Sequence, residues 1–100
     1  MYKDIIHYQL AEGVDQQHLL KVAGDIIESW MNKQVGFIKW EIHKNVNDNS
    51  YTDIVYWESE SDAKNSEREM MNIPNAGDWF ACYKEGSISS QNLQHLGSFK

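Results

Sequence analysis

Apolar and polar residues alternate through residues 36–59, and this alternation predicts a pair of strands. Ile38, Trp40 and Ile42 occupy every second position of the first run, with charged or polar residues between them. A spacing of two residues is typical of a strand that buries one face. The second run, 51–58, is rich in aromatic and β-branched residues. The Asn, Asp and Ser residues between the runs favour a turn, so we predict a β-hairpin.

A helical pattern precedes this hairpin. Apolar residues lie three and four positions apart from Leu19 to Trp30, which predicts an amphipathic helix that continues to about Lys33. Asp15 is in position to cap the first turn of this helix. Ahead of the helix, residues Lys3–Leu10 alternate again and are predicted to form the first strand, with odd- and even-numbered residues on opposite faces.

The pattern weakens after the hairpin. Ser59 or Ser61 is expected to cap a second helix of about three turns, and Pro74 interrupts the helical segment. Asn75 then begins another short helical turn. Ser87–Leu96 is predicted to be the final strand, with a bulge because its apolar residues have an odd spacing.

The predicted order is β-α-β-β-α-β in one domain, residues 1–100, which is an α+β ferredoxin-like fold with a four-stranded antiparallel sheet. We expect the strand order 4-1-3-2, with both helices on one face. The other face is expected to carry aromatic and apolar side chains that need a partner. A chain of 100 residues also builds only a thin core, so we predict a homodimer formed through this open face. Its expected residues are Ile5, His7, Gln9, Phe37, Lys39, Glu41, His43, Val55 and Trp57.

Composition and charge argue against several classes of function. The net charge is −6, and Arg68 is the only arginine, which argues against nucleic-acid binding because that requires clustered Lys and Arg. Cys82 is the only cysteine, so neither an intramolecular disulfide nor a cysteine zinc site is expected. No apolar run approaches the length of about 18 residues that spans a membrane. The first residues lack the pattern of a signal peptide, and by elimination we expect a cytoplasmic protein.

The element order and one local segment resemble a known superfamily. Residues 54–63, IVYWESESDA, are similar to the third strand and second helix of the dimeric α/β-barrel superfamily, especially its antibiotic-biosynthesis-monooxygenase-like (ABM-like) domains. The resemblance implies a homodimer with a pocket between sheet and helices, and activities that include cofactor-independent oxygenation of polycyclic phenols, haem degradation and isomerisation. Haem-degrading members carry a Trp and a His in the second helical region. Ala63–Met71 contains neither, so haem degradation is not expected and no cofactor is predicted.

His7 is the candidate catalytic residue. It lies in a predicted central strand on the more polar face, and an imidazole can accept a phenolic or enolic proton near neutral pH. The alternative is that His7 only hydrogen-bonds to a neighbouring strand or across the dimer. The four histidines show no His-x-His or His-x-x-x-His spacing, so no metal site is predicted.

Tyr8, Trp57, Trp79 and Tyr83 are candidates for an aromatic ligand pocket, although core packing would explain such residues equally well. Two hypotheses follow. The first is a cofactor-independent monooxygenase or isomerase that acts on an aromatic or enolic metabolite, and the second is a non-catalytic ligand-binding or structural dimer. A closed apolar cavity with His7 projecting into it would favour the enzyme, and a filled interior would favour the second hypothesis.

Overall fold

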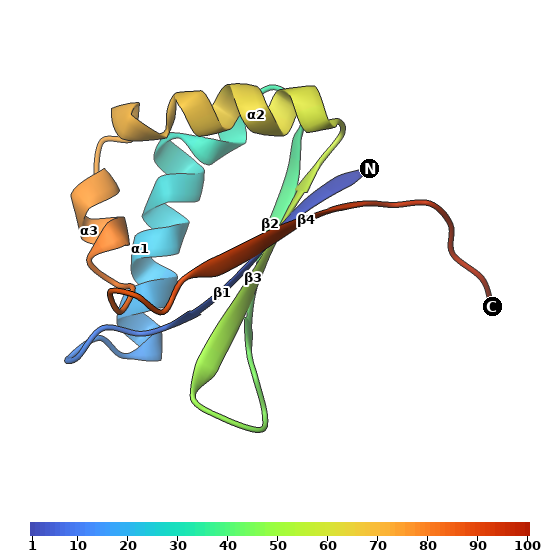
Figure 1. Cartoon of the computed structure of the whole chain (residues 1–100). Coiled ribbons are helices and arrows are strands. Elements are labelled where there is room, and N and C mark those ends of the chain that lie inside the picture. The colour runs from blue at the N-terminus through green and yellow to red at the C-terminus, as the bar shows by residue number, and fades with distance from the viewer.

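The four strands form one antiparallel sheet in the computed structural model, which describes residues 1–100 (Figure 1). The strands lie in the order β2-β3-β1-β4, which is the predicted 4-1-3-2 order seen from the other edge. The ferredoxin-like β-α-β-β-α-β topology is therefore confirmed. The strand bounds are β1 (Tyr2–Gln9), β2 (Phe37–Lys44), β3 (Ser50–Trp57) and β4 (Ser89–Gln94).

The helices gather on one side of the sheet (Figure 1). The Asp15 side chain caps the first of them by accepting the His18 backbone N–H at 2.8 Å. Ser59 caps the second by accepting the Asp62 backbone N–H at 3.2 Å, so the first of the two proposed serine caps is confirmed. None of the helices is long and apolar enough to cross a membrane. Their bounds are α1 (Gln16–Ser29), α2 (Glu60–Arg68) and α3 (Ala76–Phe80), with 3₁₀ turns at Met31–Lys33 and Met70–Asn72.

Two element predictions need correction. The first helix ends at Ser29 rather than Lys33, because the Trp30 backbone leaves helical geometry at φ −140° and a 3₁₀ turn follows. The predicted bulge in the final strand is absent, and the sheet's register shift lies in β2, just after Phe37. Ile88 precedes β4, so its odd spacing to Leu93 needs no bulge.

The register corrects part of the predicted open face. Val55 pairs with Asp4 and Trp57 pairs with Tyr2, and both Val55 and Trp57 are buried on the side of the helices. Phe37 also packs against this core, edge-on to Trp57 with ring centroids 5.7 Å apart. The predicted phase of β3 was therefore wrong by one residue, and such a slip moves every side chain to the other face.

The sheet face away from the helices is a mixed polar and apolar surface. Tyr56 lies on it, with the ammonium groups of Lys3 and Lys39 5.2 and 4.6 Å from its ring centroid. Its hydroxyl donates to Glu41 Oε1 at 2.8 Å. We call this surface the open face. By strand register it comprises Lys3, Ile5, His7, Gln9, Lys39, Glu41, His43, Ser50, Thr52, Ile54, Tyr56, Ser89, Gln91 and Leu93.

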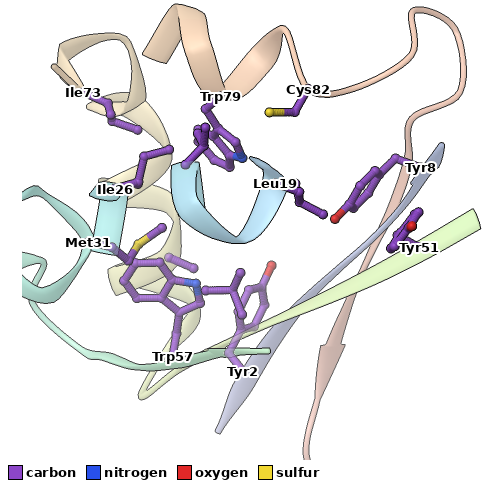
Figure 2. Close-up of a cluster of buried hydrophobic side chains, with 13 residues drawn as sticks. Tyr2, Tyr8, Leu19, Ile26, Met31, Tyr51, Trp57, Ile73, Trp79 and Cys82 are labelled. Carbon is purple, nitrogen blue, oxygen red and sulfur yellow. The ribbon is translucent and has the colours of Figure 1, made fainter. Parts of the chain in front are cut away.

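The hydrophobic core fills much of the space between the sheet and the helices (Figure 2). Ile26 and Leu19 of α1 are almost completely buried there, and burying each such side chain contributes about 1.5–3 kcal/mol. Gly36 lies where the chain passes the start of α2, with φ +82°, and a Cβ there would overlap the Asp62 side chain. Only glycine fits that position without rearrangement. The core residues labelled in Figure 2 are Tyr2, Tyr8, Leu19, Ile26, Met31, Tyr51, Trp57, Ile73, Trp79 and Cys82.

Candidate ligand-binding site

A cavity of about 330 Å³ lies between the sheet and the helices. Twelve of its 17 lining residues are hydrophobic, which suits an apolar ligand, and its size is that of a small-molecule site. The interior is therefore not completely filled by the protein's own side chains. The aromatic lining residues are Trp30, Trp40, Trp57, Trp79, Phe80 and Tyr83.

The aromatic wall of the cavity is held together by direct contacts. The Trp40 and Trp79 rings have centroids 5.5 Å apart at 60°, and Phe80 stacks on Trp79 at 5.2 Å. The Trp79 indole N–H donates to the Tyr83 hydroxyl at 2.5 Å. Because α3 carries Trp79 and Phe80 while β2 carries Trp40, this wall joins the short helix to the edge strand and offers flat faces to a planar ligand.

A buried carboxylate, Asp53, lies behind this wall. It is completely buried and accepts hydrogen bonds from the Tyr8 hydroxyl at 2.7 Å and from Trp40 Nε1 at 3.1 Å. Burial raises the pKa of Asp53 to about 6, although both hydrogen bonds oppose that rise. Burial and the neighbouring Asp53 also raise the pKa of Tyr8. Asp53 does not line the cavity. It acts on the cavity wall only through its hydrogen bond to Trp40, which holds the indole in place.

The polar part of the cavity lining includes Asp4 of β1 and Asn92, its partner on β4. The Asn92 amide is oriented with Nδ2 donating to Asp4 Oδ1 at 2.8 Å and Oδ1 accepting from the Tyr2 hydroxyl at 3.1 Å. Burial raises the pKa of Asp4, the hydrogen-bonding interaction with the Trp57 indole opposes that rise, and the charge of Glu67 adds to it. Trp57 Nε1 is buried and makes no hydrogen bond of ordinary geometry, so its interaction with the Asp4 carboxylate is a long or bent one. We call Asp4, Asn92 and Trp57 Nε1 the polar end.

The cavity lining carries negative but no positive side chains. Asp4 and Glu67 are its two carboxylates, and no Lys, Arg or His lines it. An anionic ligand would therefore meet like charge without the charged donors that normally bind carboxylate or phosphate. Elsewhere, no three His, Cys, Asp or Glu side chains converge.

The structure separates His7 from the cavity. His7 lies on the open face, where its Nδ1 is 2.9 Å from the Thr52 hydroxyl of the neighbouring strand. It lines a different and mostly polar hollow together with Lys84 and Ser87. An imidazole in this position cannot reach a molecule in the cavity, because the sheet lies between them. That His7 accepts a proton from a substrate thus stays a prediction, and it can apply only to a molecule bound on the open face.

The predicted ligand-binding residues are brought together only in part. Trp57, Trp79 and Tyr83 line the cavity. Tyr8 lies behind the lining, with its hydroxyl bonded to Asp53 and its ring 4.4 Å, centroid to centroid, from that of Tyr83. Sequence reasoning missed Asp53, and the available signal was an aspartate inside a strand of β-formers, where Asp is depleted.

The sheet has the split β-α-β-β-α-β topology, and the cavity lies under the helices that cover one of its faces. No protein-family model matches the chain, and no curated protein matches it in sequence. Solved structures do match it in fold. The resemblance drawn from residues 54–63 is thereby confirmed at the level of fold.

Three structures illustrate the match. SnoaB, a cofactor-independent oxygenase from Streptomyces nogalater, aligns with a TM-score of 0.76 and 12% identity over 97% of this chain and 94% of its own. The ActVA-Orf6 monooxygenase of Streptomyces coelicolor, in complex with nanaomycin D, aligns with a TM-score of 0.68 and 13% identity over 99% and 90%. A conserved protein from Methanosarcina mazei Go1 aligns with a TM-score of 0.72 and 13% identity over 95% and 92%. Sequence identities this low show only that the fold is shared.

Proposed function

We propose that this protein binds a small aromatic or enolic metabolite in the cavity under its helices and oxidises it as a cofactor-independent monooxygenase, or isomerises it. The observation that carries the proposal is the aromatic-walled cavity of about 330 Å³ in a fold shared with a cofactor-independent oxygenase and a monooxygenase. Planar aromatic ligands gain most from such a wall, because each ring buries a large apolar surface.

The oxygenation balances without a cofactor when the substrate is electron-rich. Dioxygen takes four electrons from an activated ring CH₂ group, one oxygen atom becomes the new carbonyl, and the other leaves as water with the two hydrogens. Loss of one proton to give the enolate or phenolate makes the substrate electron-rich. An apolar cavity supports this step because it keeps water away from the reactive intermediate.

A second candidate function is ligand binding without catalysis. The observation that favours it is the position of His7 on the open face, together with a cavity lining that contains no His, Lys or Arg. Under this function, the same aromatic ligands bind and are released unchanged.

A homodimer through the open face is part of the proposal. Leu93 is 42% exposed, and the half-buried Ile54 and Tyr56 lie on the same face by strand register. Pairing of this surface with a second copy would remove apolar area from water. The charged residues around Tyr56 would then contribute to the specificity of pairing.

The test is oxygen consumption with a panel of phenols and fused-ring ketones, measured beside ligand binding by calorimetry. Ala63 lines the cavity and Ala81 is exposed outside it, so Ala63→Leu should reduce both binding and oxygen uptake, whereas Ala81→Leu should leave both unchanged. Melting curves confirm that each variant is folded. Binding without oxygen uptake would support the second function, and no binding by any aromatic compound would refute both.

A further inference from the structure

The two hydrogen bonds of Asp53 connect this buried carboxylate to the aromatic wall of the cavity. We propose that Asp53 is a positioning residue for the ligand, and that the cavity binds its ligand more tightly when Asp53 is ionised than when it is protonated. The inference rests on the proposed function, because a ligand must occupy the cavity, and it adds a proton to the binding equilibrium. Ligand affinity should therefore depend on pH even for a ligand that carries no titratable group.

Two routes lead from Asp53 to the same pair of rings. The first is direct, because the Trp40 indole N–H donates to Asp53 Oδ2 at 3.1 Å and the Trp40 ring centroid lies 5.5 Å from that of Trp79. The second runs through Tyr8, whose hydroxyl donates to Asp53 Oδ1 at 2.7 Å and whose ring centroid lies 4.4 Å from that of Tyr83. The Tyr83 hydroxyl in turn accepts the Trp79 indole N–H. Trp40, Trp79 and Tyr83 all line the cavity, so both routes end at the surface that meets the ligand.

The charge of the Asp53 carboxylate determines how firmly it holds the wall. An ionised carboxylate accepts both bonds, and charge-assisted hydrogen bonds are roughly twice as strong as neutral ones. A protonated carboxyl carries a hydrogen of its own that has to fit between the same two donors, so Trp40 is held less firmly. A ligand then has to order the indole as it binds, and that ordering lowers its affinity. The expected difference between the two states of Asp53 is about fivefold in affinity.

The surroundings of Asp53 place its titration in an accessible pH range. Asp53 faces Tyr8 from β1, Trp40 and His43 from β2, and Tyr83 from the segment after α3. Burial raises the pKa of Asp53 to about 6, and the two hydrogen bonds and the charge of His43 oppose that rise. Burial and the charge of Asp53 raise the pKa of both tyrosines, so the phenols stay protonated while Asp53 titrates. Ligand affinity should therefore rise as the pH rises through about 6.

The carboxylates that line the cavity would act in the opposite direction. Asp4 and Glu67 face the ligand directly, so their protonation removes charge from the lining and favours an uncharged aromatic ligand at low pH. Asp53 favours the same ligand at high pH, because it acts through the wall. The sign of the pH dependence therefore distinguishes Asp53 from the lining carboxylates.

The experiment is calorimetric titration of 2-naphthol and 2-methoxynaphthalene into the wild-type protein from about pH 5 to about pH 7.5. A naphthol, like the tyrosine phenol with its pKa of about 10, stays uncharged over this range, and the ether has no titratable group. The affinity for both should rise about fourfold with pH. Asp53→Asn should remove the rise. Asp25→Asn, a matched change on the exposed side of α1, should keep it.

A second measurement needs no variant. Since the ionised form of Asp53 binds the ligand more tightly, ligand binding near pH 6 should release a fraction of a proton from the wild-type protein. Titrations in buffers of different ionisation enthalpy measure this release. The test therefore stays decisive if Asp53→Asn does not fold.

The outcomes separate this inference from the proposed function. If neither compound binds the folded wild-type protein at any pH, the proposed function fails and the role of Asp53 fails with it. If both bind with an affinity that is flat or falls as the pH rises, or if Asp53→Asn keeps the rise, only the role of Asp53 is overturned. Proton uptake instead of release on binding would overturn it as well.

Discussion

Replacement of Asp53 by asparagine should change how stability depends on pH. The carboxyl is completely buried between the Tyr8 hydroxyl and the Trp40 indole, and burial raises its pKa from 3.8 to about 6. The folded protein therefore binds this proton more tightly than the unfolded chain does. The stabilisation is complete below about pH 4 and is lost as the pH rises through about 6, and it amounts to about 3 kcal/mol at about 1.4 kcal/mol per pKa unit.

The assay is urea unfolding of the wild type and Asp53→Asn at intervals from about pH 4 to about pH 7. The substituted side chain cannot titrate, and its amide can still accept from Tyr8 but leaves Trp40 Nε1 facing an amide nitrogen, which costs about 1 kcal/mol at every pH. Other carboxylates titrate equally in both proteins and cancel in the difference. The wild-type advantage should therefore shrink by about 2.5 kcal/mol over this range. Parallel stability curves would refute the conclusion that burial controls the proton on Asp53.

Three further changes test the packing, the assembly and the role of His7. Trp40→Ala should lower the free energy of unfolding by about 3 kcal/mol, because it removes the hydrogen bond to Asp53 and the contact with Trp79; coincident urea midpoints would contradict this. Light scattering should give twice the monomer mass, and Ile54→Lys on the open face should give a folded monomer, whereas a monomeric wild type would contradict the dimer. His7→Gln should leave ligand affinity and any oxygen uptake unchanged, and a loss of uptake alone would restore His7 as a base.

Local signals predicted the order of the elements and the starts of the helices well. Asp15 and Ser59 cap their helices as expected, because an N-cap depends on a few adjacent residues. The phase of β3 could not be predicted in the same way. Ile54 and Tyr56 alternate with Val55 and Trp57, so both faces of this strand carry β-formers, and periodicity does not distinguish them. Only pairing with β1 determines which face meets the helices.

The site was predictable where it coincides with the core. Trp57, Trp79 and Tyr83 were found because large aromatic residues line the interior of a small domain. The polar end was missed because Asp4 and Asn92 meet only when β1 pairs with β4, far apart in the chain. The alternation of residues along β1 already placed His7 on one sheet face, and the resemblance implied a pocket on the other face, under the helices. The structure agrees with this placement of His7.

The crystal structure of the protein with bound 2-naphthol tests the central claim most directly. The account predicts that the rings lie in the cavity between the sheet and the helices, against Trp40 and Trp79. Naphthol bound on the open face beside His7, with the cavity empty or closed by the aromatic side chains, would contradict it.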